Sequence, residues 1–301
     1  MTDFVSLHNH THFSILDALS SPKDLLNRAK ELGQKAVAIT DHGSIGAAWD
    51  AFKASKGTDV KLIIGCEMYF LDDVTKKNER FRHIILLAKN AIGYKNLLTL
   101  NKEGFDNSVV YTKRVYPLID WKLLEKYSEG LVCLTSCSNG IIAQLLMTKK
   151  SDEAEVALKK LMGIFGDDLG LEIQANALKR GSNLYNDIIE QATVNRWLIN
   201  LGKKHNVRVV ATTNSHYIKK EDHETHDMLL AIGSHQPTYS NFRLRYDCPD
   251  FYMKTGDEVK TFFERNFGSD YAEEVCANTI YFADKCEEPL WIDPKYSNPS
   301  G

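Results

Sequence analysis

The chain has 301 residues, 43% of them hydrophobic, with a formal net charge of -3 and a pI near 6.4. This length and composition are typical of one globular domain with a sizeable core. The slightly acidic balance excludes a generally basic nucleic-acid binder, because such proteins carry positive patches that release counterions from phosphates. Any contact with DNA must therefore be local or depend on metal ions.

Two further classes of protein are excluded by simple patterns. The first residues lack the basic and apolar regions of a signal peptide, and no apolar run approaches the length of a membrane span. We therefore expect a cytoplasmic protein with no membrane contact. The six cysteines form no Cys-x-x-Cys pair, so neither a disulfide framework nor a zinc ribbon is indicated and most are expected to be buried thiols.

The first half of the chain alternates apolar runs with amphipathic segments, in βαβα order. Ser20 or Ser21 can cap the first helix, Pro22 suits its first turn, and Gly33 ends it. Residues 72–80 are polar, and we interpret them as a solvated loop rather than a lysine patch that contacts DNA. Strands are predicted at 4–7, 35–40, 60–70 and 83–88, helices at 45–56, 93–101 and 121–127, and an irregular segment or short hairpin at 107–117.

The second half continues the same alternation as far as residue 212. Strands are predicted at 130–137, 169–174 and 207–212, and helices at 141–147, 152–165 and 183–205. About seven βα units result, and this number favours a distorted (β/α)7 barrel of the TIM type.

The last part of the chain differs from the rest in its sequence pattern. Helices are predicted at 221–232, 257–263 and 271–285, and residues 293–301 form a proline-punctuated segment of linker type. Residues 239–252 mix arginines with aromatic residues. Such a mixture can stack on nucleic-acid bases, but we favour packing of this extension on the flank of the barrel.

Metal-ligand side chains recur at the ends of the predicted strands. His8 and His10 are two residues apart, so strand alternation points both to the same side. That pair alone fits ordinary packing as well as metal binding. Ligand-type residues also follow later apolar runs: Asp41, His42, Glu67, Cys137, Asn214 and His216. His83 differs, because it precedes its apolar run. Because α/β barrels gather their sites where strand ends meet, the recurrence indicates one metal site at the C-terminal ends of the strands.

Four stretches resemble successive motifs of the PHP (polymerase and histidinol phosphatase) domain family: residues 8–17, 38–43, 64–67 and 83–90. Three later stretches, 124–131, 226–232 and 251–254, resemble the polymerase branch, which begins the α subunit of bacterial DNA polymerase III. The resemblance covers essentially the whole chain. Histidinol phosphatase is the second possibility within the family.

The resemblance implies a cluster of up to three divalent metals, with Glu67 as the carboxylate that bridges two of them. The expected ligands are His8, His10, Asp17, His42, Glu67, His83, Cys137, Asn214 and His216. Asp41, Glu67 and His83 are expected to act in catalysis, Asp41 by orienting a ligand or taking a proton. His12, His205, His223, His226 and His235 are expected not to bind metal.

Asn214 is one departure from the family pattern, which commonly has Asp two residues before the histidine matched by His216. Strand alternation predicts that Asn214 and His216 share a face, so its amide oxygen could still reach the cluster. A neutral amide would bind a cation more weakly than a carboxylate.

This ligand set suits Zn²⁺, Mn²⁺ or Fe²⁺ better than Mg²⁺. The chemistry expected from clustered metals is phosphoester hydrolysis. For the polymerase branch, the resemblance implies a proofreading 3′-5′ exonuclease that acts on a DNA 3′ end. The alternatives are a catalytically silent, metal-stabilised scaffold that docks a proofreading subunit, and a stand-alone PHP phosphatase.

The resemblance also predicts how the chain is divided. Residues 1–290 would form the PHP domain, with a barrel core at 1–220 and an extension at 221–290. Residues 291–301 would lead toward a polymerase palm domain, present in cis or as a separate chain. No polymerase activity is expected from the chain itself.

Overall fold

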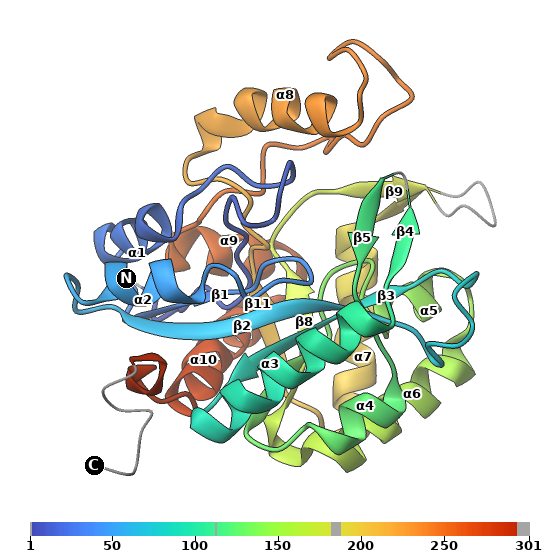
Figure 1. Cartoon of the computed structure of the whole chain (residues 1–301). Helices are drawn as coiled ribbons and strands as arrows, with labels where there is room; N and C mark the ends of the chain where they lie inside the picture. The colour runs from blue at the N-terminus through green and yellow to red at the C-terminus, as the bar shows by residue number, and fades with distance from the viewer. Residues whose placement is uncertain (1, 112, 182–187, 294–301) are drawn as a thin grey trace, which may run out of the picture.

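A curled sheet lies at the centre of the molecule and helices cover its outer side (Figure 1). The structure is a computed structural model that describes residues 2–111, 113–181 and 188–293. The main path of the sheet runs through β1 (Ala36–Ile39), β2 (Lys61–Phe70), β3 (Arg82–Ala88), β7 (Leu131–Leu134), β8 (Leu169–Gln174) and β11 (Val209–Thr212), and β6 (Leu118–Ile119) pairs with β2.

The N-terminal segment closes this sheet. Ser6 forms a parallel bridge with Val37 of β1, and Asn9 forms one with Ser215, which follows β11. The His10 backbone N–H donates to the Ser215 carbonyl oxygen at 2.8 Å. The segment lies between β1 and β11, at the two ends of the main path, and so takes the place of a seventh strand. The predicted distorted (β/α)7 barrel is therefore confirmed.

One strand causes the distortion. β3 is antiparallel to both of its neighbours, β2 and β7, whereas the pairs β1–β2, β7–β8 and β8–β11 are parallel. Because β3 runs backwards, its first residues lie beside the last residues of β2, with His83 opposite Tyr69. This orientation explains why His83 precedes its apolar run while the other candidate ligands follow theirs.

Side-chain caps mark the starts of several helices, of which the cap at Ser21 was predicted. Ser21 and Asp24 form a capping box before α1, the Asp120 side chain accepts from the Leu123 N–H at the start of α4, and Thr255 caps α9 with Glu258. The α-helices are α1 (Pro22–Glu31), α2 (Ala48–Ser55), α3 (Ala91–Asp106), α4 (Trp121–Lys126), α5 (Ala143–Met147), α6 (Ser151–Phe165), α7 (Gln191–His205), α8 (His223–Gly233), α9 (Gly256–Phe267) and α10 (Ser269–Asp284). Short 3₁₀ helices span Gly166–Asp168, Lys220–Asp222 and Leu290–Ile292.

Two helices differ most from their predicted bounds, and smaller differences occur at α2, predicted to begin at residue 45, and α9, predicted to end at residue 263. The helix predicted at 183–205 begins only at Gln191, because β10 (Ile188–Glu190) pairs with β9 (Lys179–Gly181) instead; residues 183–187 lie outside the described residues. The helix predicted at 93–101 is longer at both ends, since the Asn90 side chain caps α3. Residues 107–117 contain a hairpin of β4 (Val109–Tyr111) and β5 (Arg114–Tyr116), one of the two predicted possibilities.

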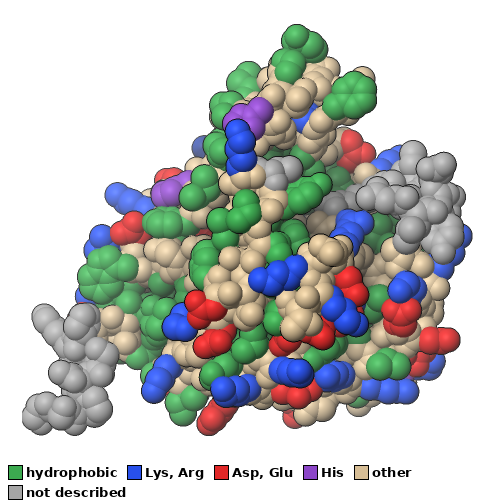
Figure 2. All heavy atoms as spheres, turned by 45° about the vertical axis from the view of Figure 1, so that its right-hand side comes forward, with side chains coloured by type: hydrophobic (Ala, Val, Ile, Leu, Met, Phe, Trp, Pro, Cys, Tyr) green, Lys and Arg blue, Asp and Glu red, His purple; other side chains and the backbone are tan. Residues whose placement is uncertain are grey.

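The helix α8 and the loop that follows it project above the barrel (Figure 1, top), and hydrophobic side chains are exposed there (Figure 2). Phe251 is buried, and its carbonyl oxygen accepts from the His216 backbone N–H at 2.7 Å, so packing on the barrel is confirmed for part of residues 239–252. Tyr239 and Phe242, by contrast, are 83% and 94% exposed. The packing interpretation is wrong for these two side chains.

Two expectations drawn from composition can be compared with the fold. All six cysteines are buried free thiols, as predicted. Among the described residues, no helix combines the length and the apolar character needed to cross a membrane.

The approach of α3 to the loop before β7 gives a stability prediction. A Cβ on Gly93 would lie 1.8 Å from the Gly130 carbonyl oxygen, whereas a Cβ on Gly163 in α6 would meet nothing within 4 Å. Gly93→Ala should lower the free energy of unfolding by about 2 kcal/mol or more. Gly163→Ala should raise it by about 0.5–1 kcal/mol. Urea denaturation measures both changes, and unaltered stability of Gly93→Ala would contradict the close packing.

Candidate metal centre

Side chains from five parts of the barrel meet at one rim. His8 and His10 come from the closing segment, His42 follows β1, and His216 follows β11. Glu67 and His83 lie on the neighbouring strands β2 and β3, and the backbone of Glu67 forms a parallel bridge with that of His42. His8 and His10 are fully buried, and their Nε2 atoms lie 3.1 Å apart. The predicted alternation of this pair is therefore confirmed.

The Glu67 carboxylate lies in the middle of these histidines. Its Oε2 is 3.4 Å from His8 Nε2 and 3.2 Å from His10 Nε2. The same oxygen is 3.0 Å from His42 Nδ1. The other oxygen, Oε1, is 3.1 Å from His83 Nδ1 and accepts a hydrogen bond from the Ser136 hydroxyl. Each oxygen of one carboxylate thus faces a different set of ligand-type atoms, as expected of a bridging group.

Asp17 supplies a second carboxylate on the opposite side of His42. Its Oδ2 lies 3.0 Å from His42 Nε2 and 3.3 Å from His216 Nε2. His42 therefore lies between two carboxylates, one at each ring nitrogen. The arrangement extends the cluster from Glu67 to His216.

The residues fit divalent cations. Three groups of side chains have ligand atoms within 4.8 Å of one another: His10, His42 and His216; His8, His10 and Glu67; His42, Glu67 and His83. Five buried atoms in this region have no hydrogen-bond partner among the described residues: Asp17 Oδ2, His42 Nδ1, Glu67 Oε2, Asn214 Oδ1 and His216 Nε2. Leaving such atoms without partners is costly, and bound cations would offset that cost. Imidazole and carboxylate donors suit Zn²⁺, Mn²⁺ or Fe²⁺.

Two predicted ligands lie at the edge of the cluster. Cys137 Sγ is 3.8 Å from both Glu67 Oε1 and His83 Nδ1. Asn214 has φ of 51°, and β11 ends two residues earlier. Strand alternation therefore does not apply at Asn214, and that basis for placing it beside His216 is wrong. Its carbonyl oxygen instead accepts from His216 Nδ1 at 2.9 Å and turns the other ring nitrogen toward Asp17.

Electrostatics separate the histidines into two kinds. Burial lowers the pKa of His8, but Glu172 and Glu67 outweigh it and raise that pKa to about 9. Burial is likewise outweighed at His42, where Glu67 and Asp17 raise the pKa to about 10. At His10, burial and the neighbouring His42 and His216 hold the pKa well below its ordinary value. His10 is therefore neutral and ready to bind a cation.

Asp41 lies behind the cluster and is fully buried. It accepts from the Thr11 backbone N–H at 2.6 Å, the Thr11 hydroxyl at 2.8 Å and the Ser14 hydroxyl at 2.7 Å. The same Ser14 hydroxyl is 3.1 Å from His10 Nδ1. Burial raises the pKa of Asp41, although these hydrogen bonds oppose the rise. Its contacts favour orienting His10 through Ser14 over direct contact with substrate.

Glu172 on β8 was missed by the sequence analysis. Its Oε1 is 2.6 Å from His8 Nδ1 and also accepts from the Thr212 hydroxyl at 2.6 Å. Such a carboxylate fixes the ring so that the other nitrogen, Nε2, faces the cluster. A signal was present in the sequence, because a carboxylate inside a fully buried strand needs a partner.

The chain matches the PHP domain over residues 6–176. It belongs to the PHP domain family. DNA polymerase III subunit alpha of Aquifex aeolicus is 36% identical, covering 99% of this chain and 26% of that protein. The Thermus aquaticus subunit is 33% identical over 97% of this chain and 23% of its own length. The chain thus spans about a quarter of the length of these relatives. An amidohydrolase from Chromobacterium violaceum has a TM-score of 0.47 and 11% identity, covering 70% of this chain and 87% of that structure.

The other described histidines of this PHP domain are members of none of the three ligand groups. His12 is exposed, and His205 Nε2 is 3.2 Å from Glu155 Oε2 on α6. His226 is closer than expected: it is buried, and its Nε2 donates to the Asp17 carbonyl oxygen at 2.7 Å. Burial lowers the pKa of His226 to about 4, so it supports the Asp17 loop as a neutral ring. His223 and His235 likewise belong to none of the three ligand groups.

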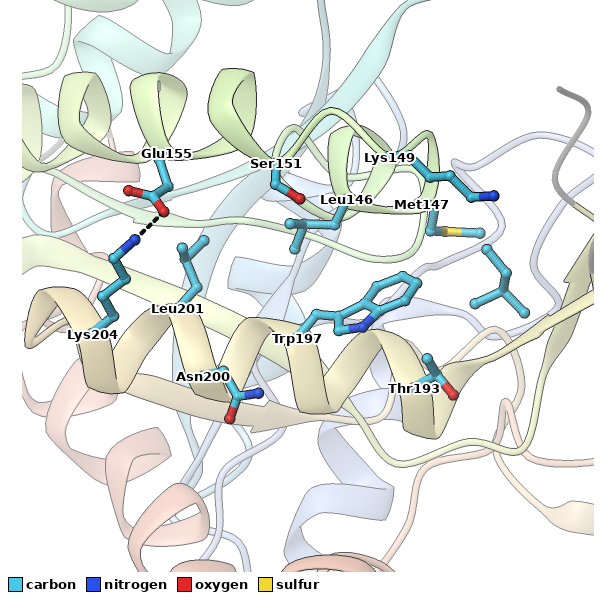
Figure 3. Close-up of a pocket in the computed structure, with 11 residues that line it drawn as sticks. Leu146, Met147, Lys149, Ser151, Glu155, Thr193, Trp197, Asn200, Leu201 and Lys204 are labelled. Atoms are coloured by element: carbon cyan, nitrogen blue, oxygen red, sulfur yellow. Dashed lines mark hydrogen bonds and ion pairs between the residues drawn. The ribbon is translucent and has the colours of Figure 1, made fainter. Parts of the chain in front are cut away.

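A cavity of about 570 Å³ elsewhere in the PHP domain is not part of the centre. It lies between α5, α6 and α7, where Leu146, Trp197 and Leu201 line it and Lys204 pairs with Glu155 (Figure 3). None of the candidate ligands lines it. Its walls are largely apolar, so it offers no cation site.

The contact between His8 and Glu172 gives a prediction for metal binding. Glu172→Gln removes the charge that holds His8 and should weaken metal affinity about 10- to 100-fold. Glu155→Gln is a matched control, since Glu155 also pairs with a histidine but is partly exposed and belongs to none of the three ligand groups. Calorimetric titration of metal-free protein with Zn²⁺ or Mn²⁺ measures both affinities. Equal affinities for Glu172→Gln and the unmodified protein would remove Glu172 from the centre.

Proposed function

We propose that this chain is the PHP domain of a bacterial-type DNA polymerase III α subunit, and that it hydrolyses phosphodiester bonds at DNA 3′ ends in a metal-dependent reaction. The observation that carries the proposal is the Glu67 carboxylate, whose two oxygens face four buried or half-buried histidines at one barrel rim. The similarity to α subunits over nearly the whole chain supports the polymerase context.

The residues of the centre have two roles: some would bind the metals, and others orient the metal ligands. His8, His10, Asp17, His42, Glu67, His83 and His216 would hold the metals, with Cys137 and Asn214 at the edge. Divalent cations held there would supply the charge that activates water and neutralises phosphate oxygens. Glu172 and Asp41 keep His8 and His10 oriented, and Ser136 donates to Glu67 and so fixes its carboxylate.

A second candidate function rests on the burial of the centre. His8, His10 and Glu67 are each at most 1% exposed, whereas the His42 side chain is 18% exposed. A cluster this enclosed also suits metals that only stabilise the fold, in a silent scaffold that supports a polymerase and docks a proofreading subunit. Bound metal without hydrolysis would assign this role.

The proposal predicts slow release of mononucleotides from single-stranded or frayed 3′ ends when Mn²⁺ or Zn²⁺ is present. His10→Ala and Glu67→Ala should each abolish release, because both side chains contribute to the same ligand group. His12→Ala is the matched control, since this exposed histidine lies outside the cluster. Gel analysis of 5′-labelled oligonucleotides measures the release. Activity that survives both His10→Ala and Glu67→Ala would come from a contaminating nuclease, and primer extension with dNTPs should be undetectable.

A further inference from the structure

A second cavity, of about 650 Å³, opens beside the metal centre. Four cationic residues line it: Arg80 from the loop before β3, Lys179 from β9, and Arg243 and Arg245 from the segment after α8. That segment projects at the top of the molecule in Figure 1. The described residues that line the cavity include no aspartate or glutamate. We call it the arginine cleft.

The arginine cleft shares its walls with the metal centre at two places. Asn139 lines the cleft, and its backbone N–H donates to Cys137 Sγ at 3.4 Å while its carbonyl oxygen accepts from the His83 N–H at 2.9 Å. On the other side, the Tyr246 ring lies 5.6 Å from the His216 ring. A molecule bound in the cleft would therefore reach the rim of the metal cluster.

The charges in the cleft favour an anion. Arg243 and Arg245 share one carboxylate, Asp227, at 2.8 Å and 3.4 Å, so the pair keeps a net positive charge. The Arg243 side chain is fully buried and its Nε has no hydrogen-bond partner among the described residues. Gln144 Nε2, on another wall of the cleft, is also buried without such a partner. Both donors are buried below the cleft surface, so the feature that matches phosphate oxygens is the excess positive charge of the arginine pair.

Aromatic side chains beside the arginines narrow the class of ligand. Phe242, between the lining residues Asn241 and Arg243, is 94% exposed, and Tyr239 is 83% exposed. Exposed rings next to phosphate-binding cations are typical of proteins that bind single-stranded nucleic acid, because unpaired bases stack on them. An acidic peptide would use the cations but gain nothing from the rings.

We propose that the arginine cleft binds the phosphate backbone of a single-stranded oligonucleotide and leads its end to the metal centre. Arg80 and Arg245 contact phosphates, and the buried Arg243 holds Asp227, which Arg245 also contacts. Phe242 and Tyr239 stack on bases outside the cleft. The inference rests on the proposed function for the fate of the strand, but binding itself is independent of hydrolysis.

Binding is measured by fluorescence anisotropy with a labelled deoxythymidine decamer and chelator-treated protein, so no strand is cut. The double variant Arg80→Gln with Arg245→Gln should weaken binding at least about tenfold and reduce the slope of log Kd against log salt by about 1.4. Phe242→Ala should weaken it about fivefold or more. Lys53→Gln with Lys102→Gln removes two exposed cations from α2 and α3 and should change Kd less than about twofold.

The outcomes separate this inference from the proposed function. The proposed cleft would be wrong if the lysine control weakened oligonucleotide binding as much as the arginine variant, or if the arginine variant did not weaken it. This holds even if the protein hydrolyses strands. Tight, arginine-dependent binding would support the cleft even if no hydrolysis is found with any metal. A third outcome would favour an acidic peptide as the ligand and overturn the proposal. In that case binding depends on the arginines, is unchanged in Phe242→Ala, and is competed by poly-glutamate at equal charge.

Discussion

The Glu67 carboxylate is buried at the barrel rim, in contact with the ring nitrogens of four histidines. Burial would raise its pKa, but His42, His83 and His8 outweigh this effect and hold the pKa well below its ordinary value. An ionised carboxylate in a barrel rim needs positive charge around it. Protonated histidines can supply that charge, and divalent cations can supply more of it. The segment that closes the barrel also brings His8 and His10 to this carboxylate. The same backbone contacts therefore close the barrel and form the metal centre.

Much of this could be predicted from local patterns. Alternation placed His8 and His10 together, and a capping serine located the start of α1. The direction of β3 could not be predicted, because strand pairing is set by tertiary contacts rather than by the apolar run itself. His83 nevertheless offered a clue, since a ligand at the start of a strand reaches the common rim only if that strand is antiparallel.

Other features were beyond local patterns for definite physical reasons. Asn214 adopts a left-handed backbone after β11 ends, where strand alternation no longer applies. Glu172 belongs to the centre only because β8 and the closing segment meet across the barrel, a contact between residues 164 positions apart. The arginine cleft likewise forms between segments distant in the chain, and composition averaged over the whole chain hides its local positive charge.

Metal binding at this centre can be measured by elemental analysis of protein purified without chelator, combined with thermal melting before and after exhaustive chelation. The arrangement around Glu67 predicts bound transition metal, up to three equivalents, and a lower melting temperature after its removal, because the packed carboxylates then lose their counter-charge. Metal-free protein whose melting temperature is unchanged by chelation or by added Zn²⁺ and Mn²⁺ would contradict the account.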